Sequence, residues 1–335
     1  MLNYFNNKRE IYMGIKQEIL RYSRQEKMQP LGNWFDAALE DLIAQNIYVD
    51  VNGLEDVGQK LVQNLRQYSQ THRINTAVIG MSGGVDSALT AALFKAAGWK
   101  VIGVTMPIHQ KQDETDRGIE ACRALNLDHL HIDLTLQYED LLESVRDYDN
   151  KIDDPKNSIR RGNLRVRSRM ITLYNIASLE KGLVGSTDNF SELAAGFWTL
   201  HGDVGDLAPI QSLLKSWEVP KMAEIYGVPT STVFATPTDG LGISNGDEDQ
   251  FGFSYLEFDI MLMKLCQLDK SFSDRESMLN FLDIPQTEIA RANQILDRIR
   301  MSVFKRQNPY NLKHPLQNNR YSGLAQVDQT LLKNK

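Results

Sequence analysis

The sequence has little cysteine, no long apolar run and no excess of basic residues, and each absence excludes a class of protein. Two cysteines in 335 residues, Cys122 and Cys266, are too few for a disulfide framework and lack the spacing of a zinc site. No apolar stretch approaches the roughly 20 residues of a membrane helix, and the charged residues 1–20 lack the apolar region of a signal peptide. The net charge of −6 does not favour a basic surface for nucleic acid. We therefore expect a cytoplasmic globular protein that binds neither nucleic acid nor a membrane.

Apolar and amphipathic segments alternate along the middle of the chain. Short apolar runs at 75–80, 100–106, 129–132 and 182–185 have the length of buried strands, and stretches of helical period separate them. Strands that alternate with helices form a parallel sheet with helices on both faces. We therefore expect an α/β fold with a doubly wound parallel sheet.

Helical patterns also flank this central region. Residues 1–50 are amphipathic and predict a helical N-terminal extension, either a packing element or an oligomer contact, and 287–306 predict a further helix. Residues 200–255 are rich in Gly, Pro, Asp and Thr, and a loop-rich stretch of that length is usually functional. We expect one α/β domain over 51–315, followed by a polar tail over 316–335.

A glycine-rich loop carries the clearest chemical signal. The segment Gly80-Met81-Ser82-Gly83-Gly84-Val85-Asp86-Ser87 links the first expected strand to a strongly helical stretch. Its glycines let the backbone approach an anion, while the N–H groups at the helix start and the two serine hydroxyls can donate to phosphate oxygens. Asp86 would repel phosphate unless it held a divalent cation that also binds the phosphate. The Gly-Lys-Ser/Thr ending of a Walker A motif is missing, so the loop belongs to another class of phosphate loop.

This loop resembles the signature of the N-type ATP pyrophosphatases, the PP-loop superfamily. The resemblance implies a loop that binds the pyrophosphate end of ATP and an enzyme that cuts ATP between its α and β phosphates. Members activate a carboxylate or carbonyl oxygen as an adenylate and then displace AMP with a nitrogen or sulfur nucleophile. The loop alone does not choose among these members.

Three further segments narrow the resemblance to one family. They are an arginine-rich stretch at 161–170, a Gly- and Asp-rich stretch at 185–209, and the segment 236–241. With the loop, their order and spacing resemble the ammonia-dependent NAD synthetases from about residue 54 to about residue 310. The resemblance implies a homodimeric ligase that amidates deamido-NAD (nicotinic acid adenine dinucleotide) with ammonia. ATP would be consumed through an acyl-adenylate, and the products would be NAD, AMP and pyrophosphate.

The resemblance also implies ligands for ATP and for magnesium. The implied ATP-binding residues are the loop Gly80, Met81, Ser82, Gly83, Gly84, Val85, Asp86 and Ser87, together with Thr187, Lys215 and Thr238. The implied magnesium ligands are Asp86 and Glu192, two carboxylates from separate segments, which is the oxygen donor set that a hard cation prefers.

Five residues are implied in catalysis or on the substrate side of the site. Asp203 matches an aspartate near the nicotinate carboxylate and the ammonia, and Lys215 matches the lysine that reaches the ATP phosphates. Arg167, Asp206 and Lys305 match residues that contact the dinucleotide. The resemblance therefore places the catalytic roles on Asp203 and Lys215, and substrate binding on the other three.

The chain departs from the family pattern at several positions on the substrate side. Asn189 and Phe304 stand where the family commonly has histidine, Leu200 stands where it has lysine, and the run after Asp203 is one residue shorter. Amidation of nicotinate mononucleotide therefore remains an alternative. Another PP-loop amidotransferase, a tRNA-modifying thiolase and a non-catalytic ATP-binding sensor also remain open.

The source of the nitrogen is a separate question. Glutamine-dependent relatives carry an added amidase domain with a Glu-Lys-Cys triad, and the 50 residues before the α/β region are too few for such a domain. No cysteine precedes Cys122. We therefore expect free ammonia, or a separate amidase chain, to supply the nitrogen.

Overall fold

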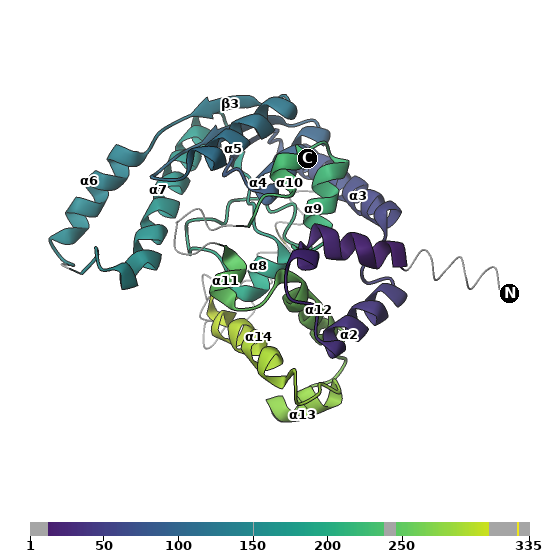
Figure 1. Cartoon of the computed structure of the whole chain (residues 1–335). Coiled ribbons are helices and arrows are strands. Elements are labelled where there is room, and N and C mark those ends of the chain that lie inside the picture. Colours follow the sequence, from purple (N-terminus) through teal and green to yellow (C-terminus); the bar gives the residue numbers. More distant parts are fainter. Residues whose placement is uncertain (1–12, 150, 238–245, 308–326, 328–335) are drawn as a thin grey trace.

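The structure is a computed structural model of the chain (Figure 1). The residues that it describes are 13–149, 151–237, 246–307 and 327. Thr238, an expected ATP contact, and nearly all of the expected polar tail lie outside the described residues. None of the helices within the described ranges is both long and apolar enough to cross a lipid bilayer.

A parallel sheet of four strands forms the centre of the fold, and its strands lie where the apolar runs predict them (Figure 1). The strands are β1 Thr76–Gly80, β2 Lys100–Thr105, β3 Asp128–His131 and β4 Leu183–Val184. Their spatial order is β3-β2-β1-β4, and every neighbouring pair is parallel. The chain moves outward from β1 to β3 and then returns to the other side of β1. Ligands of open α/β sheets bind where the direction reverses in this way, beyond the carboxyl ends of the strands.

Alternate residues of the strands face two separate cores. Ala77 and Ile79 belong to the larger core, whereas Val78 and Val184 belong to the smaller one. The helices that cover the larger core are α3 Val51–His72, α4 Val85–Ala96, α5 Gln112–Ala124 and α9 Glu218–Ile225, and those over the smaller core are α6 Thr135–Arg146 and α7 Ser158–Leu179. The doubly wound parallel sheet expected from the sequence is therefore confirmed.

The remaining elements are mostly short helices. They are α2 Asn33–Ala44, α8 Phe190–Ala195, α10 Thr230–Val233, α11 Asp247–Phe251, α12 Tyr255–Cys266, α13 Arg275–Phe281, α14 Ile289–Met301 and the 3-10 turns η1 Gln25–Lys27, η2 Pro155–Asn157 and η3 Val303–Gln307. Three helices, α9, α10 and α11, lie within 200–255, which the composition predicts to be rich in loops. Helices of four to eight residues are too short to show a helical period, and Gly227, Pro229 and Gly246 beside them are typical of turns.

The described part of the N-terminal extension packs into the larger core. Phe35, Leu39 and Leu42 of α2 are at most 1% exposed, and α2 lies beside α12 in Figure 1. The indole N–H of Trp34 donates to the carbonyl oxygen of Leu282 at 2.7 Å. Burial of one apolar face against the rest of the protein stabilises this helix.

Replacing Leu39 with alanine should lower the free energy of unfolding by about 2–5 kcal/mol, because a fully buried side chain is lost and a cavity remains. The control is Leu136→Ala on α6, where the side chain is 72% exposed. This control should change stability by less than about 0.5 kcal/mol. Chemical denaturation measures both variants, and equal effects would mean that the Leu39 side chain contributes nothing to the core.

Candidate active site

A cavity of about 500 Å³ lies at the carboxyl ends of β1 and β4, where the strand order reverses. Its lining includes the whole loop Gly80–Ser87 together with Thr187, Glu192, Asp203, Lys215 and Lys305. These residues are far apart in the sequence. The fold therefore brings most of the residues singled out in the sequence to one place.

The loop has a conformation that requires glycine at Gly83. Its φ is 87°, and a Cβ at this position would lie 2.1 Å from the carbonyl oxygen of Glu114. The hydroxyls of Ser82 and Ser87 are 3.2 Å apart, and Ser87 donates to the carbonyl oxygen of Gly84 at 3.0 Å. Within the described residues, no side chain caps the N-terminus of α4. The first N–H groups of α4 can therefore donate to an anion held by the loop.

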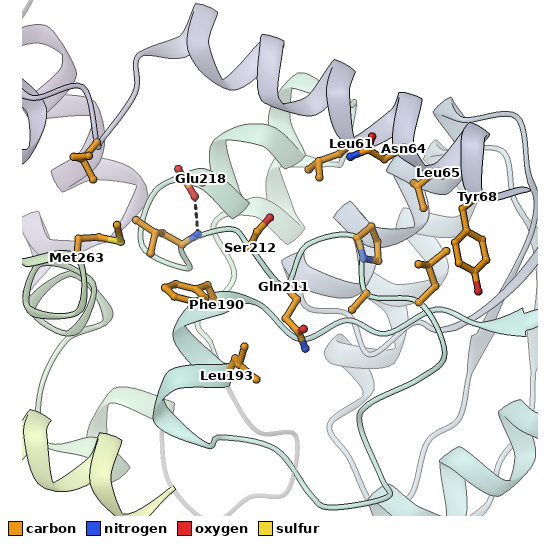
Figure 2. A pocket seen from close by; sticks show the side chains of 15 residues that line it. Leu61, Asn64, Leu65, Tyr68, Phe190, Leu193, Gln211, Ser212, Glu218 and Met263 are labelled. Atoms are coloured by element: carbon orange, nitrogen blue, oxygen red, sulfur yellow. Dashed lines mark hydrogen bonds between the residues drawn. The ribbon is translucent and has the colours of Figure 1, made fainter. Parts of the chain in front are cut away.

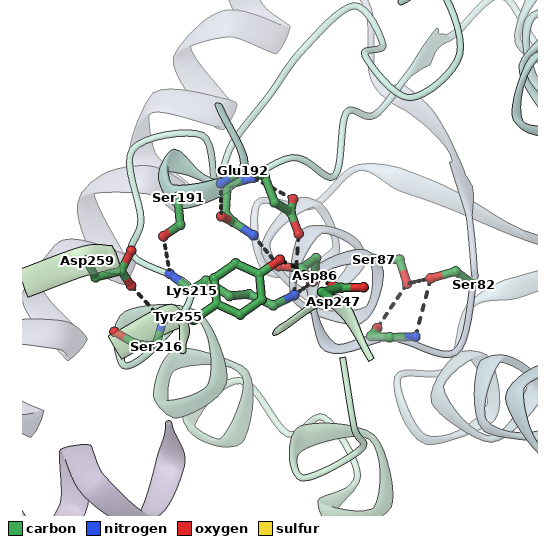
Figure 3. A network of polar contacts seen from close by, with 12 residues as sticks. Ser82, Asp86, Ser87, Ser191, Glu192, Lys215, Ser216, Asp247, Tyr255 and Asp259 are labelled. Atoms are coloured by element: carbon green, nitrogen blue, oxygen red, sulfur yellow. Dashed lines mark hydrogen bonds and ion pairs between the residues drawn. The ribbon is translucent and has the colours of Figure 1, made fainter. Parts of the chain in front are cut away.

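The ammonium group of Lys215 lies between two carboxylates (Figure 3). Lys215 Nζ forms an ion pair with Asp86 Oδ2 at the start of α4 and lies 3.5 Å from Glu192 Oε1 on α8. The other oxygen of Asp86 accepts a hydrogen bond from Asn189 Nδ2 at 2.9 Å. Asn189 also caps α8, because its Oδ1 accepts the N–H of Glu192 at 2.9 Å. Asn189, one of the departures from the family pattern, thus orients both carboxylates.

Two backbone hydrogen bonds hold the chain at the base of Lys215. The N–H of Lys215 donates to Ser191 Oγ, and the N–H of Ser216 donates to Asp259 Oδ2, both at 2.9 Å (Figure 3). Asp259 is fully buried on α12, and burial raises the pKa of its carboxyl to about 6. The Lys215 side chain therefore extends from a backbone fixed by α8 on one side and by α12 on the other.

Negative charge exceeds positive charge around Lys215. Burial, followed by the charge of Asp86, raises the pKa of Glu192 well above its ordinary value. Burial works to lower the pKa of Lys215, but Asp86 and Glu192 reverse that effect and raise it. Asp247 at the start of α11 adds a third carboxylate that acts on both groups. Uptake of a further cation would relieve this repulsion.

Asp203 and Lys305 form a second polar group in the same cavity. Asp203 Oδ2 accepts the N–H of Thr199 at 2.5 Å, and burial raises the pKa of this carboxyl to about 6. Lys305 Nζ donates to the carbonyl oxygen of Gly196 at 2.7 Å and lies 5.2 Å from the ring centroid of Trp198. Burial lowers the pKa of Lys305. A carboxyl that titrates near neutral pH can exchange a proton with a bound group.

Two residues expected on the substrate side lie outside this cavity. Arg167 is exposed on α7, and its Nε donates to the carbonyl oxygen of Leu200 at 3.1 Å. Asp206 accepts the N–H of Val184 and the hydroxyl of Tyr174, both at 2.9 Å, and so holds the end of β4. Any contact of Arg167 or Asp206 with substrate stays a prediction.

Several charged residues of the cavity lining are not singled out in the sequence analysis, and Arg169 and Asp247 are two of them. Arg169 lines it and donates to Gln110 Oε1 at 2.9 Å, and burial lowers the pKa of Arg169 to about 10. Residues two apart on a helix point to different sides, so an arginine-rich stretch does not reveal that Arg169 is partly buried in the cavity and Arg167 exposed. Asp247 begins an acidic run after Gly246, and that run is the one signal in the sequence for its place in the site.

A second cavity of about 590 Å³ is mainly apolar (Figure 2). Leu61 and Leu65 of α3 line it, as do Phe190 and Leu193 of α8. None of the predicted site residues belongs to its described lining. The candidate active site is therefore the cavity at the phosphate loop.

Comparison with known proteins identifies the family. Residues 57–309 match the model of the family described as NAD synthase. The chain belongs to the NAD synthase family. Among its relatives, the NH(3)-dependent NAD(+) synthetase of Mycoplasmopsis pulmonis is 35% identical over 232 residues, which cover 68% of this chain and 86% of that protein.

Solved structures of similar proteins have the same fold. The NMN synthetase of Francisella tularensis has a TM-score of 0.65 at 25% identity, over 78% of this chain and 99% of that one. The NH3-dependent NAD synthetase of Campylobacter jejuni has a TM-score of 0.60, also at 25% identity and with the same coverage. The solved structures similar to this chain thus include one named for NMN and one named for NAD.

Replacing Asp203 with asparagine should raise the free energy of unfolding by roughly 1–3 kcal/mol at about pH 8, because the wild-type carboxylate is ionised there while partly buried. Asparagine keeps an oxygen that can accept the N–H of Thr199. The folded-state pKa of about 6 lies above the unfolded value, so the native protein retains its proton between about pH 4 and pH 6. The difference in free energy of unfolding between the variant and the wild type should therefore shrink as the pH falls through 6 and vanish near about pH 4. Urea unfolding over this range measures it, and a difference independent of pH would contradict the raised pKa.

Proposed function

We propose that this protein is an ammonia-dependent NAD synthetase that amidates deamido-NAD and converts ATP to AMP and pyrophosphate. The observation that carries the proposal is the meeting of the phosphate loop, Lys215, the carboxylates Asp86 and Glu192, and the polar pair Asp203 and Lys305 in one cavity. Membership of the NAD synthase family supports it. The catalytic domain would extend over about 51–315, with 1–50 as its N-terminal extension.

The phosphate loop would bind the triphosphate of ATP. The N–H groups at the start of α4 and the hydroxyls of Ser82 and Ser87 would donate to phosphate oxygens, and Thr187 and Thr238 would add contacts to ATP. The nicotinate carboxylate then attacks the α-phosphorus, the α–β anhydride bond breaks and pyrophosphate leaves. Lys215 would stabilise the negative charge that develops on the departing pyrophosphate.

We also propose that Asp86 and Glu192 hold a magnesium ion. Both offer carboxylate oxygens, the donors that this ion prefers, and Asp86 adds to the repulsion that raises the pKa of Glu192. In the described residues, no group of three or more His, Cys, Asp or Glu side chains could hold a metal by itself. Phosphate oxygens of ATP would therefore be needed as further ligands. When bound, the ion would supply positive charge to the phosphates.

Asp203 would act in the second step. Ammonia attacks the acyl carbon of the adenylate, the bond to AMP breaks, and the nitrogen loses a proton as the amide forms. With a pKa of about 6, Asp203 is ionised at neutral pH and can orient the ammonia or accept that proton. Lys305 would contact the substrate beside it. Free ammonia, or ammonia from an amidase on another chain, would be the nitrogen source.

Amidation of nicotinate mononucleotide is the second candidate function. Two residues expected to contact the dinucleotide, Arg167 and Asp206, lie outside the cavity, and Leu200 stands where the family commonly has lysine. The similarity to the Francisella tularensis NMN synthetase covers 78% of the chain. The two candidates share the same chemistry at the carboxylate and differ in the size of the substrate.

Release of AMP from ATP should require ammonia, magnesium and the correct substrate, so deamido-NAD and nicotinate mononucleotide are tested in parallel. We expect turnover with deamido-NAD. Asp86→Asn should lower kcat by more than about 100-fold, since it removes charge at the phosphates. The control Asp56→Asn, on the exposed face of α3, should leave kcat unchanged.

Each outcome of this assay has a distinct meaning. Turnover with the mononucleotide alone would favour the second candidate. ATP binding without AMP release for either substrate would contradict the enzyme and favour an ATP-binding sensor. Full activity of Asp86→Asn, or activity without magnesium, would contradict the proposed metal site.

We further propose a homodimer with α7 in the contact. Ile171 and Leu179 of α7 are 71% and 77% exposed, and Tyr174 between them is 42% exposed, so the second half of α7 carries large apolar side chains that the rest of the described chain leaves uncovered. Ile171→Glu should convert the dimer to a monomer in sedimentation velocity. The control Met301→Glu, at an exposed position of α14, should leave it dimeric. A monomeric wild-type protein, or a dimer unaffected by Ile171→Glu, would contradict this interface.

A further inference from the structure

The N-terminal extension touches the segment that carries Lys215, and we propose that it positions this lysine for ATP. The contacts come from the segment 13–50, which precedes the region matched by the family model at 57–309. The proposal rests on the proposed function, in which Lys215 binds the ATP phosphates. Tyr22 and Tyr48 would be positioning residues, since they act through Lys215 and do not line the cavity.

The first contact is made by Trp217, two residues after Lys215. Trp217 is fully buried, and its indole N–H donates to the carbonyl oxygen of Val49 at 2.9 Å. Its ring meets the ring of Tyr22 edge-on, with centroids 5.7 Å apart. Two separate parts of the N-terminal extension thus hold one side chain beside the lysine.

A second aromatic residue of the extension, Tyr48, is buried in the same core as Trp217. Tyr48 is 1% exposed, and burial, followed by the charge of Asp259, raises the pKa of its hydroxyl well above the ordinary value. Asp259 is the carboxylate that accepts the N–H of Ser216 at 2.9 Å. Tyr48 and Trp217 belong to the same buried core, so the ring of Tyr48 adds to the packing around the lysine segment.

The third contact fixes the helix that follows. The hydroxyl of Tyr22 donates to Glu224 Oε2 at 2.5 Å and accepts from Lys221 Nζ at 3.1 Å. Both partners lie on α9, which begins directly after Trp217. Because the Lys215 side chain is long, a small rotation of the backbone at 215–217 would move its ammonium group away from Asp86 and Glu192.

Other contacts of the same extension do not reach the lysine segment. The indole N–H of Trp34 donates to the carbonyl oxygen of Leu282 at 2.7 Å, beside α13. Trp34 and Trp217 therefore each contribute one indole hydrogen bond between the extension and the rest of the protein. The bond of Trp217 lies two residues from Lys215, whereas the bond of Trp34 lies at Leu282, beside α13. The two tryptophans form a matched pair for an experiment.

Trp217→Phe and Trp34→Phe should separate positioning from stability. Each removes one indole hydrogen bond and keeps an aromatic ring. Trp217→Phe should raise the Kd for magnesium-ATP, measured by calorimetry, and the KM for ATP by about three- to tenfold. The KM for the second substrate should stay unchanged. Trp34→Phe should leave the Kd for ATP unchanged. It should also lower the melting temperature, though by less, because Trp34 is only partly buried whereas Trp217 is fully buried.

The proposal is overturned if Trp217→Phe weakens ATP binding no more than Trp34→Phe does. If Trp217→Phe does not fold, Tyr22→Phe replaces it, because it removes the hydroxyl that bonds Glu224 and Lys221 and keeps the buried ring. The same rise in the Kd for ATP is then expected, and an unchanged Kd overturns the proposal.

ATP binding is measured without the second substrate, so the proposed function and the positioning role can fail separately. Wild-type turnover with no effect of Trp217→Phe on ATP binding would leave the function and reject the positioning. Weakened ATP binding in Trp217→Phe, together with no wild-type turnover on either substrate, would support the positioning role and reject the proposed function.

Discussion

The ammonium group of Lys215, held between Asp86 and Glu192, is the interaction on which the site depends. Each of the three charges comes from a different segment: the start of α4, the capping box of α8, and the chain before α9. Removing one partner from a buried ionic cluster leaves the others uncompensated, which is strongly unfavourable. The cluster therefore fixes these three segments relative to one another as well as preparing a place for phosphate.

The sheet explains why these segments meet at all. β1 and β4 are parallel neighbours, although about 100 residues of chain with two further strands lie between them. The phosphate loop leaves the end of β1, and the segment with Asn189 and Glu192 leaves the end of β4. Both leave the sheet at the carboxyl ends of neighbouring strands, and the cavity lies where they meet.

Much of this arrangement could be predicted from the sequence, because the signals are local. Buried parallel strands are continuous apolar runs, and the phosphate loop is a short motif between a strand and a helix, so 75–80 and Gly80–Ser87 could be placed directly. Lys215 and Glu192 could be assigned through the resemblance to a family, and the structure brings both to the loop. Asp86, Glu192 and Lys215, the three charged residues of the cluster, could therefore be chosen without knowledge of the tertiary structure.

Other features depend on contacts between distant parts of the chain, and local patterns do not encode these. The choice between Arg167 and Arg169 depends on how α7 is rotated against the sheet. The hydrogen bond between Asp206 and the end of β4 depends on where the chain returns after the active-site segment. The amphipathic period of α2 predicts that one face is buried, but not that Val49 and Tyr22 reach Trp217.

The packing of α2 against α12 has a consequence for folding while the chain is being synthesised. Asp41 and Lys264, which are joined by an ion pair across this contact, are 223 residues apart in the chain. At about 5–20 residues per second, a ribosome takes on the order of ten seconds or more to synthesise the partner of α2. During that time Phe35, Leu39 and Leu42 have no native surface to cover them. The apolar face of α2 therefore lacks its native partner until α12 has been made, and the active site cannot be complete before Lys305 is synthesised.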